Sequence, residues 1–178
     1  MIESKLETER LHLLALTADQ LALALEAPER LEQELGVPLS REQFSEPVPR
    51  AIGMKLSKMS EANEDVHPWT TYWLIVIAAD PYGAGMAGFK GEPDEEGAVE
   101  IGYGIDVAYR RQGYMTEAVQ ALIAWAFADP ACRAVTAQGV LRSNTGSQRV
   151  LLNAGLHVYN EDVDTQDWRI DKPHWPPN

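Results

Sequence analysis

The stretch "VEIGYGIDVAYRRQGYMTEAV", residues 99–119, constrains the fold most, because its pattern changes from strand to helix across a short turn. Apolar residues alternate with small or acidic ones through residue 106, which predicts a strand with one buried face. Residues 116–129 are apolar and alanine-rich and predict a helix that ends before Pro130. A strand that turns directly into such a helix is typical of an α/β or α+β sheet.

The rest of the chain adds six strand patterns and four helix patterns. Thr17 and Gln20 have capping-box spacing at the start of the first helix, and Gly36 is placed to end the second. We expect strands at residues 10–16, 71–80, 85–91, 133–140, 156–163 and 167–171, and helices at 17–27, 29–35, 49–63 and 144–155. The sequence predicts a single domain, residues 1–178, with a central mixed, twisted sheet of about seven strands and helices on both faces.

Two segments depart from this regular pattern. Residues 37–70 contain four prolines around one possible helix, which indicates a variable, partly irregular segment. Such a segment either covers the acceptor side of a substrate pocket or is a plain surface helix and loop. The last residues, 171–178, are expected to form a loosely held tail.

The letters "GAGMAG", residues 83–88, match the glycine pattern of dinucleotide-binding folds. That pattern works only where its third glycine opens a helix that faces a pyrophosphate. The following residues, "FKGEPDEEG", do not favour a helix, so we interpret Pro81 and Gly83 as a hairpin turn whose glycines supply positive φ angles.

The composition limits the classes of partner. Twenty-seven acidic residues against fifteen basic ones give a formal net charge of −12, which argues against nucleic-acid binding and favours a cationic partner such as an amine or a basic polypeptide. The longest apolar run, residues 73–79, is too short to cross a bilayer, so we expect no membrane segment. The single cysteine, Cys132, suits a reducing compartment, and we expect a cytoplasmic protein. The four histidines lack ligand spacing, so no metal is expected.

The turn before the alanine-rich helix has the chemistry of an anion site. The first N–H groups of a helix lack intrahelical partners and lie at the positive end of its dipole. Gly113 allows a phosphate to approach the backbone closely, and Arg110 and Arg111 add charge-assisted hydrogen bonds. Since no G-K-[ST] follows, the sequence predicts a phosphate-bearing ligand without phosphoryl transfer.

Two motifs follow one another in the second half of the chain, "EIGYGIDVAYRRQGYMTEAVQALIAWAF" and "NTGSQRVLLNAGL". Together they resemble the GNAT-type N-acetyltransferases, and within them the ribosomal-protein N-terminal (alanine or serine) acetyltransferases. The segments "ETERLHLLAL" and "WLIVIAADPYGAGMAG" also resemble this family. Its pyrophosphate motif is [QR]-x-x-G-x-[GA]. Arg110 and Gly113 fit this motif, whereas Met115 replaces the usual small residue.

The resemblance implies where acetyl-CoA binds. The pantetheine arm is expected along Ile105, Asp106 and Val107, and Asn144 is expected to hydrogen-bond it near the thioester. Ser147 and Arg149 lie on the same short helix as Asn144. The residues expected to hold the pyrophosphate are Arg110, Arg111, Gln112, Gly113, Tyr114, Met115 and Thr116.

The catalytic residues are less constrained by the sequence. Glu100 is our candidate general base, with the alternative of a strand carboxylate paired to a surface cation. Many family members use a tyrosine acid seven residues after the motif asparagine, but that position is Leu151 here. Ser147 is then the candidate acid, unless it only bonds backbone or cofactor, and Tyr159 is a weaker candidate. A backbone N–H between residues 105 and 107 is expected to stabilise the oxyanion.

These features predict an acetyl-CoA-dependent N-acetyltransferase that acts on a primary amine, with a protein N-terminal α-amine as one candidate acceptor. The first alternative acceptor is a small amine such as a polyamine, amino acid or aminoglycoside. A second alternative is a catalytically silent CoA-binding sensor module, and a third is a plain phosphate-ligand binder. The sequence leaves open whether the protein is a monomer or a homodimer.

Overall fold

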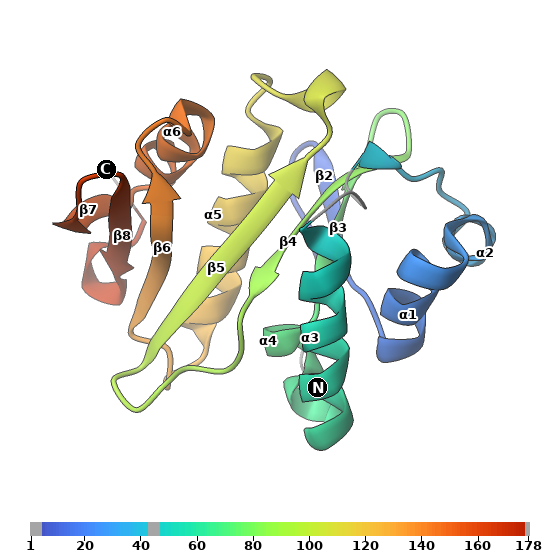
Figure 1. Ribbon diagram of the computed structural model, residues 1–178, viewed down its shortest axis with the longest axis horizontal. Helices are drawn as coiled ribbons and strands as arrows, with labels where there is room; N and C mark the ends of the chain where they lie inside the picture. Colours follow the sequence, from blue (N-terminus) through green and yellow to red (C-terminus); the bar gives the residue numbers. More distant parts are fainter. Residues whose placement is uncertain (1–4, 43–46, 177–178) are drawn as a thin grey trace.

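The protein was analysed as a computed structural model that describes residues 5–42 and 47–176. Their strands form one sheet with the order β1-β2-β3-β4-β5-β6-β8-β7 (Figure 1). Neighbouring strands are antiparallel except β5 and β6, which are parallel. The strands are β1 (Lys5–Glu7), β2 (Leu11–Ala15), β3 (Trp73–Ile77), β4 (Tyr82–Phe89), β5 (Ala98–Ile105), β6 (Ala134–Leu141), β7 (His157–Glu161) and β8 (Thr165–Asp171). The mixed sheet is confirmed, and the strand beyond the expected seven is the three-residue β1.

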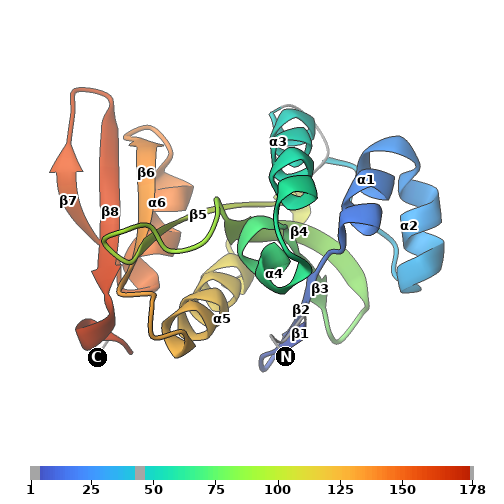
Figure 2. The same ribbon diagram turned by 90° about the horizontal axis from the view of Figure 1, so that it is seen from below.

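Helices cover both faces of this sheet, as predicted. Helices α5 (Tyr114–Ala128) and α6 (Thr145–Asn153) lie on one face, and α1 (Ala18–Glu26) and α3 (Val48–Glu61) lie on the other (Figure 2). Helix α2 (Pro28–Leu35) follows α1, and the one-turn α4 (His67–Thr70) precedes β3. Single 3-10 turns are formed by Glu64–Val66, Val107–Tyr109 and Lys172–His174. In the predicted variable segment, the described residues are therefore largely helical.

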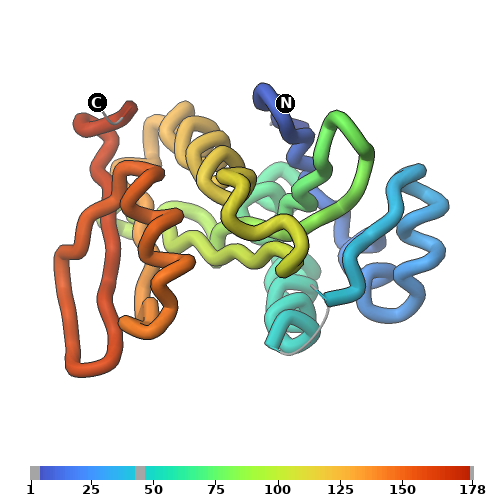
Figure 3. Tube along the Cα trace, turned by 90° about the horizontal axis from the view of Figure 1, so that it is seen from above, coloured from blue at the N-terminus to red at the C-terminus, as the bar shows by residue number. Residues whose placement is uncertain are grey.

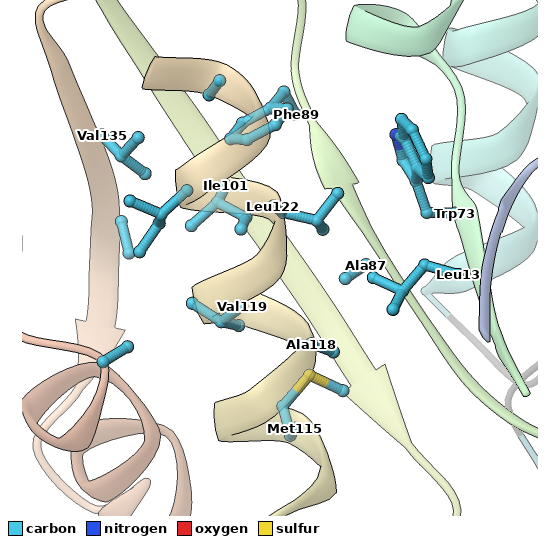
Figure 4. Close-up of a cluster of buried hydrophobic side chains, with 14 of the residues drawn as sticks. Leu13, Trp73, Ala87, Phe89, Ile101, Met115, Ala118, Val119, Leu122 and Val135 are labelled. Carbon is cyan, nitrogen blue, oxygen red and sulfur yellow. The ribbon is translucent and has the colours of Figure 1, made fainter. Parts of the chain in front are cut away.

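Each face of the sheet has its own apolar core. The core under α5 includes Trp73 and Ile75 of β3, whereas Leu74 and Val76 of the same strand belong to the core under α1 and α3. Burial on both faces explains the unbroken apolar run of β3, because successive side chains of a strand point in opposite directions. Figure 4 shows side chains of the α5 core, among them Leu13, Phe89, Ile101, Leu122 and Val135.

The predicted helix signals act as expected. The Thr17 hydroxyl accepts from the Gln20 N–H, and the Gln20 side chain accepts from the Thr17 N–H, which completes the capping box. Pro28 lies in the first turn of α2, and Gly36 ends that helix in the left-handed conformation with φ of 67°. These signals depend on residues within one helical turn, which is why they can be recognised in the sequence.

The interpretation of "GAGMAG" as turn glycines is wrong, although no dinucleotide helix follows it. Residues 78–81 form the turn, and Gly83, Gly85 and Gly88 lie inside β4 without positive φ. A Cβ at Gly85 would lie 2.5 Å from the Gly104 carbonyl oxygen, and a Cβ at Gly88 would lie 2.5 Å from that of Thr71. The glycines are needed for close packing of backbone against β4.

A buried lysine attaches α3 to the sheet. Lys55 Nζ donates to the carbonyls of Thr70 and Phe89 at 2.6 Å and to that of Thr71 at 3.3 Å. Burial, together with Lys58 and Lys90, lowers the pKa of Lys55 to about 7. The three carbonyl acceptors match the three protons of the charged ammonium, so these bonds oppose the effect of burial.

The feature that positions the site is the separation of β5 from β6. Their ladder covers only Ala98–Glu100 and Ala134–Thr136, and the two strands then diverge (Figure 1). On its other side, β6 has an irregular register with β8 between Ala137 and Val140, where Gly139 has φ of +64°. The divergence opens the sheet at the carboxyl end of β5, directly before the arginine turn.

Candidate active site

A cavity of about 690 Å³ lies where β5 ends and α5 and α6 begin. Tyr103 and Ile105 reach it from the face of β5 that also carries Val99 and Ile101, so the cavity continues the core under α5. Of the residues predicted to bind cofactor, it is lined by Ile105, Val107, Arg110, Arg111, Gly113, Tyr114, Met115, Thr116, Asn144, Ser147 and Arg149. The tertiary structure therefore brings together the two sequence motifs.

The arginine turn has the backbone of an anion site. Gly113 is the N-cap of α5 with φ of +83° and has no side-chain cap, so the first-turn N–H groups are directed at the turn. Arg111 also has a positive φ, 60°. The Arg110 Nε donates to the Ile105 carbonyl at 3.2 Å, which ties the turn to the end of β5. Met115 is buried and packs in the core (Figure 4), so its larger side chain leaves the turn open.

Arg10, which the sequence reasoning did not select, supports this turn from the position directly before β2. Its guanidinium donates to the Gln112 carbonyl at 2.9 Å and to Glu117 at 2.7 Å, and it lies 4.7 Å from the centre of the Tyr114 ring. Burial acts to raise the pKa of Glu117, but hydrogen bonds from Thr8 and Arg10 lower it overall. Arg10 precedes these partners by about a hundred residues, so no local spacing could have indicated the contact.

Helix α6 contributes the second half of the site. The Asn144 side chain caps this helix by accepting from the Ser147 N–H at 3.1 Å. The Ser147 hydroxyl lies 2.8 Å from the hydroxyl of Tyr103, which also donates to the Ser147 carbonyl at 3.2 Å. Burial raises the pKa of Tyr103 to about 12, so its phenol remains protonated at neutral pH. Leu151, at the position of the family's tyrosine, is fully buried in the core.

The even-numbered side chains of β5 lie on the opposite face. A Cβ at Gly102 or Gly104 would meet nothing within 4 Å, so these two glycines leave a shallow, open floor on that face. It faces away from Tyr103 and Ile105, because alternate residues of a strand point to opposite faces. Glu100 lies on this face and pairs with Lys90 at 2.5 Å. It does not line the cavity of the arginine turn.

Asp106 and Gln112, two of the predicted cofactor residues, do not line the cavity either. Asp106 accepts from the Ser40 hydroxyl at 2.6 Å and from the Ala108 N–H at 2.8 Å. These bonds, that from Ser40 foremost, lower the pKa of Asp106. Gln112 donates through its side chain to the Ala108 carbonyl within the turn. Both side chains shape the backbone around the cavity.

Residues 38–42 run beside the end of β5 (Figure 3). Leu39 forms a bridge with Gly83, and a Glu42 carboxylate oxygen accepts from the Val107 N–H at 3.0 Å. Part of the predicted variable segment thus contacts the strand end at which an oxyanion donor was expected. Tyr159, the weaker acid candidate, is exposed on β7 and does not line the cavity.

Residues 5–42 and 47–176 contain neither a metal-binding cluster nor a membrane-spanning helix. No group of three or more His, Cys, Asp or Glu side chains in these ranges is arranged to hold a metal ion. In the same ranges, each helix is too short or too polar to cross a membrane.

Known proteins are similar to this chain in sequence and in fold. Residues 10–157 match the family model described as the acetyltransferase (GNAT) domain. The chain is 31% identical over 170 residues to the uncharacterized N-acetyltransferase YjdG of Bacillus subtilis. The aligned region covers 92% of this chain and 95% of YjdG.

Solved structures also resemble the chain. The ribosomal-protein-S5-alanine acetyltransferase of Vibrio fischeri has a TM-score of 0.65 at 17% identity, covering 98% of this chain and all of the other. Mycobacterium smegmatis RimJ, solved with CoA-disulfide, has a TM-score of 0.61 at 15% identity, covering 93% and 84%. At these identities the two structures establish the fold alone. The matches to the family model and to YjdG establish that the chain belongs to the GNAT family of acetyl-CoA-dependent N-acetyltransferases.

Proposed function

We propose that this enzyme binds acetyl-CoA in the cavity between β5, α5 and α6 and transfers its acetyl group to a protein N-terminal α-amine. The observation that carries the cofactor part is the cavity itself, which joins the arginine turn to Asn144 and Ser147 across the divergence of β5 and β6. A small amine such as a polyamine, amino acid or aminoglycoside is the alternative acceptor.

The turn suits a pyrophosphate by charge and by shape. In this proposal the first N–H groups of α5 bond phosphate oxygens, and Arg110 and Arg111 neutralise their charge. Gly113 keeps the approach to the backbone open. Arg10 holds the Gln112 carbonyl and so keeps the turn in the shape that directs its N–H groups at the ligand. A local positive site of this kind also explains two adjacent arginines in a chain of net charge −12.

The backbone of β5 suits an amide-bearing arm. The Glu100 carbonyl and the Asp106 N–H both form hydrogen bonds with β4. Because backbone groups of alternate residues point to opposite sides of a strand, the N–H and C=O groups of Tyr103 and Ile105 point toward β6. Among the described residues, the β5–β6 ladder ends at Glu100, and an extended arm can pair there like an added strand. The Ile105 N–H is then our proposed oxyanion donor, since the Val107 N–H bonds Glu42.

The acceptor proposal rests on chemistry and on resemblance. Transfer forms a C–N bond and breaks the C–S bond, and it needs a neutral amine. An α-amine, with a pKa of about 7.7–8.0, loses its proton far more easily than a lysine amine at about 10.4. Glu100 is retained as the proposed base, on the face of β5 opposite the cavity. A fold neighbour is named as a ribosomal-protein-S5-alanine acetyltransferase, which supports a protein N-terminus as acceptor.

Calorimetry of acetyl-CoA binding tests the cofactor site. We expect micromolar binding to the wild type and a loss of at least 100-fold for Arg110→Glu. Arg30→Glu makes the same charge change on the exposed side of α2 and should bind as the wild type does. A wild type that does not bind acetyl-CoA would refute the proposed site.

An acceptor panel tests the second half of the proposal. Peptides with N-terminal alanine or serine are compared with their N-terminally blocked forms, polyamines and free amino acids, and acetylated products are read by mass spectrometry. Acetylation of the free peptide α-amine alone supports a protein N-terminus. Turnover of a small amine would replace this acceptor, and tight CoA binding without any product would favour a sensor module.

A further inference from the structure

We propose that Tyr103 is a positioning residue that directs the Ser147 hydroxyl at the sulfur of the departing thiolate. The inference rests on the proposed function, because it takes the reacting thioester to lie in the cavity of the arginine turn. It assigns a role to a tyrosine to which the sequence analysis gave none.

The geometry that carries this inference is a two-hydroxyl chain on the cavity wall. Tyr103 comes from β5 and Ser147 from the first turn of α6, and both line the cavity. Their hydroxyl oxygens are 2.8 Å apart. Asn144 fixes the Ser147 backbone through the N–H, so the remaining freedom of Ser147 is the rotation of its side chain and hydroxyl proton. The Tyr103 hydroxyl limits that rotation.

The donor and acceptor in this pair of hydroxyls follow from the protons available. Tyr103 donates one proton, either to the Ser147 hydroxyl or to the Ser147 carbonyl, 3.2 Å away. When it donates to the hydroxyl, the Ser147 proton is free to bond an acceptor in the cavity. A thiolate there selects this arrangement, since each hydrogen bond of such a chain strengthens the next.

The acidities decide between bonding and proton transfer. An alkyl thiol has a pKa of about 8.5. Burial raises the pKa of Tyr103 to about 12, so transfer of its proton to the thiolate is unfavourable by a factor of more than about 1,000. The pair therefore stabilises the developing charge by hydrogen bonds. The electron pair of the C–S bond stays on sulfur, the amine proton passes to the base, and the thiolate takes its proton from water after transfer.

The position of Leu151 gives this arrangement a structural reason. Leu151 is fully buried in the core, so α6 cannot present a hydroxyl at that position. Tyr103 brings a hydroxyl to the same helix from the neighbouring strand, 44 residues earlier in the chain. The contact exists because β5 and β6 separate beyond Glu100, which lets α6 approach the β5 side chains.

Titration of bound CoA tests the inference without turnover. The pKa of its thiol is measured from the ultraviolet absorbance of the thiolate in the wild type, Tyr103→Phe and Ser147→Ala. Arg110, Arg111 and Arg149 also line the cavity and lower this pKa in all three proteins, so the comparison is between variants. We expect each variant to raise the thiol pKa by about one unit, a tenfold loss of thiolate stabilisation. Equal thiol pKa values in the three proteins would overturn the inference.

Kinetics give a second readout. Tyr103→Phe should lower kcat about 10- to 100-fold while KM for acetyl-CoA changes less than about threefold, because a hydrogen bond to a charged group is lost only when charge develops. The double variant with Ser147→Ala should be no slower than Ser147→Ala alone, since the two residues act as one unit. Tyr82→Phe, which removes a hydroxyl outside the cavity, is the matched control.

The outcomes separate this inference from the proposed function. A wild type that fails to bind CoA refutes both. A wild type that binds and turns over acetyl-CoA, with Tyr103→Phe unchanged in kcat and in thiol pKa, refutes only the role of Tyr103. A Tyr103→Phe protein that melts lower but keeps both values would show a structural tyrosine and would also overturn the inference.

Discussion

The two faces of strand β5 carry different residues and face different surroundings. The side chains of Tyr103 and Ile105 line a cavity beside α5 and α6, and the Gly104 backbone borders it. On the face of α3, the missing side chains of Gly102 and Gly104 leave an open floor. The cavity on the first face is also lined by arginines and hydroxyl groups. The second face carries the acidic side chains of Glu100 and Asp106. In the proposed reaction, the cofactor would lie on one face of β5 and the acidic side chains that attract an amine on the other, because alternate side chains point in opposite directions. The supports of the two faces differ as well. Helix α3 is attached through the buried Lys55, and the arginine turn through Arg10, which is exposed and pairs with Glu117.

The largest expected effect is a loss of folding stability on the α3 side of the sheet. Lys55→Ala leaves the carbonyls of Thr70, Thr71 and Phe89 without their donor, and we expect the free energy of unfolding to fall by about 3–5 kcal/mol. Chemical denaturation measures this loss. Lys58→Ala, one turn further along α3 and exposed, should change stability by less than about 0.5 kcal/mol. Similar losses for the two variants would contradict an anchoring role for Lys55.

The next prediction tests whether Glu100, on the face of β5 opposite the cavity, takes part in catalysis. If Glu100 is the base, Glu100→Gln should lower kcat about 100-fold or more and leave acetyl-CoA affinity unchanged. Lys90→Met removes its ion-pair partner and is the control, with kcat reduced less than about fivefold. Steady-state kinetics with saturating acetyl-CoA distinguish the two. A Glu100→Gln enzyme with full kcat would leave Glu100 as a strand carboxylate paired to a surface cation.

A smaller effect is expected on the cavity side from Arg10→Ala. The turn would lose its bond to the Gln112 carbonyl and its contact with the Tyr114 ring, so we expect acetyl-CoA affinity to fall about tenfold. Calorimetry measures the affinity and thermal melting the stability. Arg142→Ala removes a comparably exposed guanidinium that pairs with Glu161, and its affinity should match that of the wild type. An unchanged affinity in Arg10→Ala would show that the turn holds its shape without the Arg10 side chain.

The smallest effect is the pH dependence of Glu117, which holds Arg10. Its pKa is lower in the folded protein than in the unfolded chain, so its contribution to stability is complete above the unfolded value of about 4.3 and is lost as the pH falls through the folded pKa. Glu117→Gln should therefore be less stable than the wild type by about 1 kcal/mol at pH 7. The difference should shrink on acidification below about pH 4. Denaturation curves across this range check it, and a constant difference would exclude the carboxylate charge as the cause.

Local signals could be predicted from the sequence with their details. The capping box of Thr17 and the Gly36 helix end depend on residues within one turn of each other. Helix α5 begins at Tyr114, two residues before the predicted start at residue 116. The order of strands and helices and the two-sided helix layer followed from the same local patterns together with the family resemblance. Most of the residues that the resemblance assigns to the cofactor line one cavity. Glycines were harder to interpret, because the same letters serve a turn in Gly113 and close strand packing in Gly85.

By itself, the sequence determined that a strand runs through an arginine turn into a buried helix, and that this turn has the chemistry of an anion site. Only the tertiary structure decided which face of β5 meets the cavity, that Arg10 supports the turn, that Lys55 attaches α3, and that Tyr103 meets Ser147. The physical reason is distance along the chain. Hydrogen bonds within a helical turn are set by neighbouring residues, whereas contacts between residues 15 to 109 positions apart depend on strand order and register. Those are fixed only when the whole sheet assembles and both of its cores are buried.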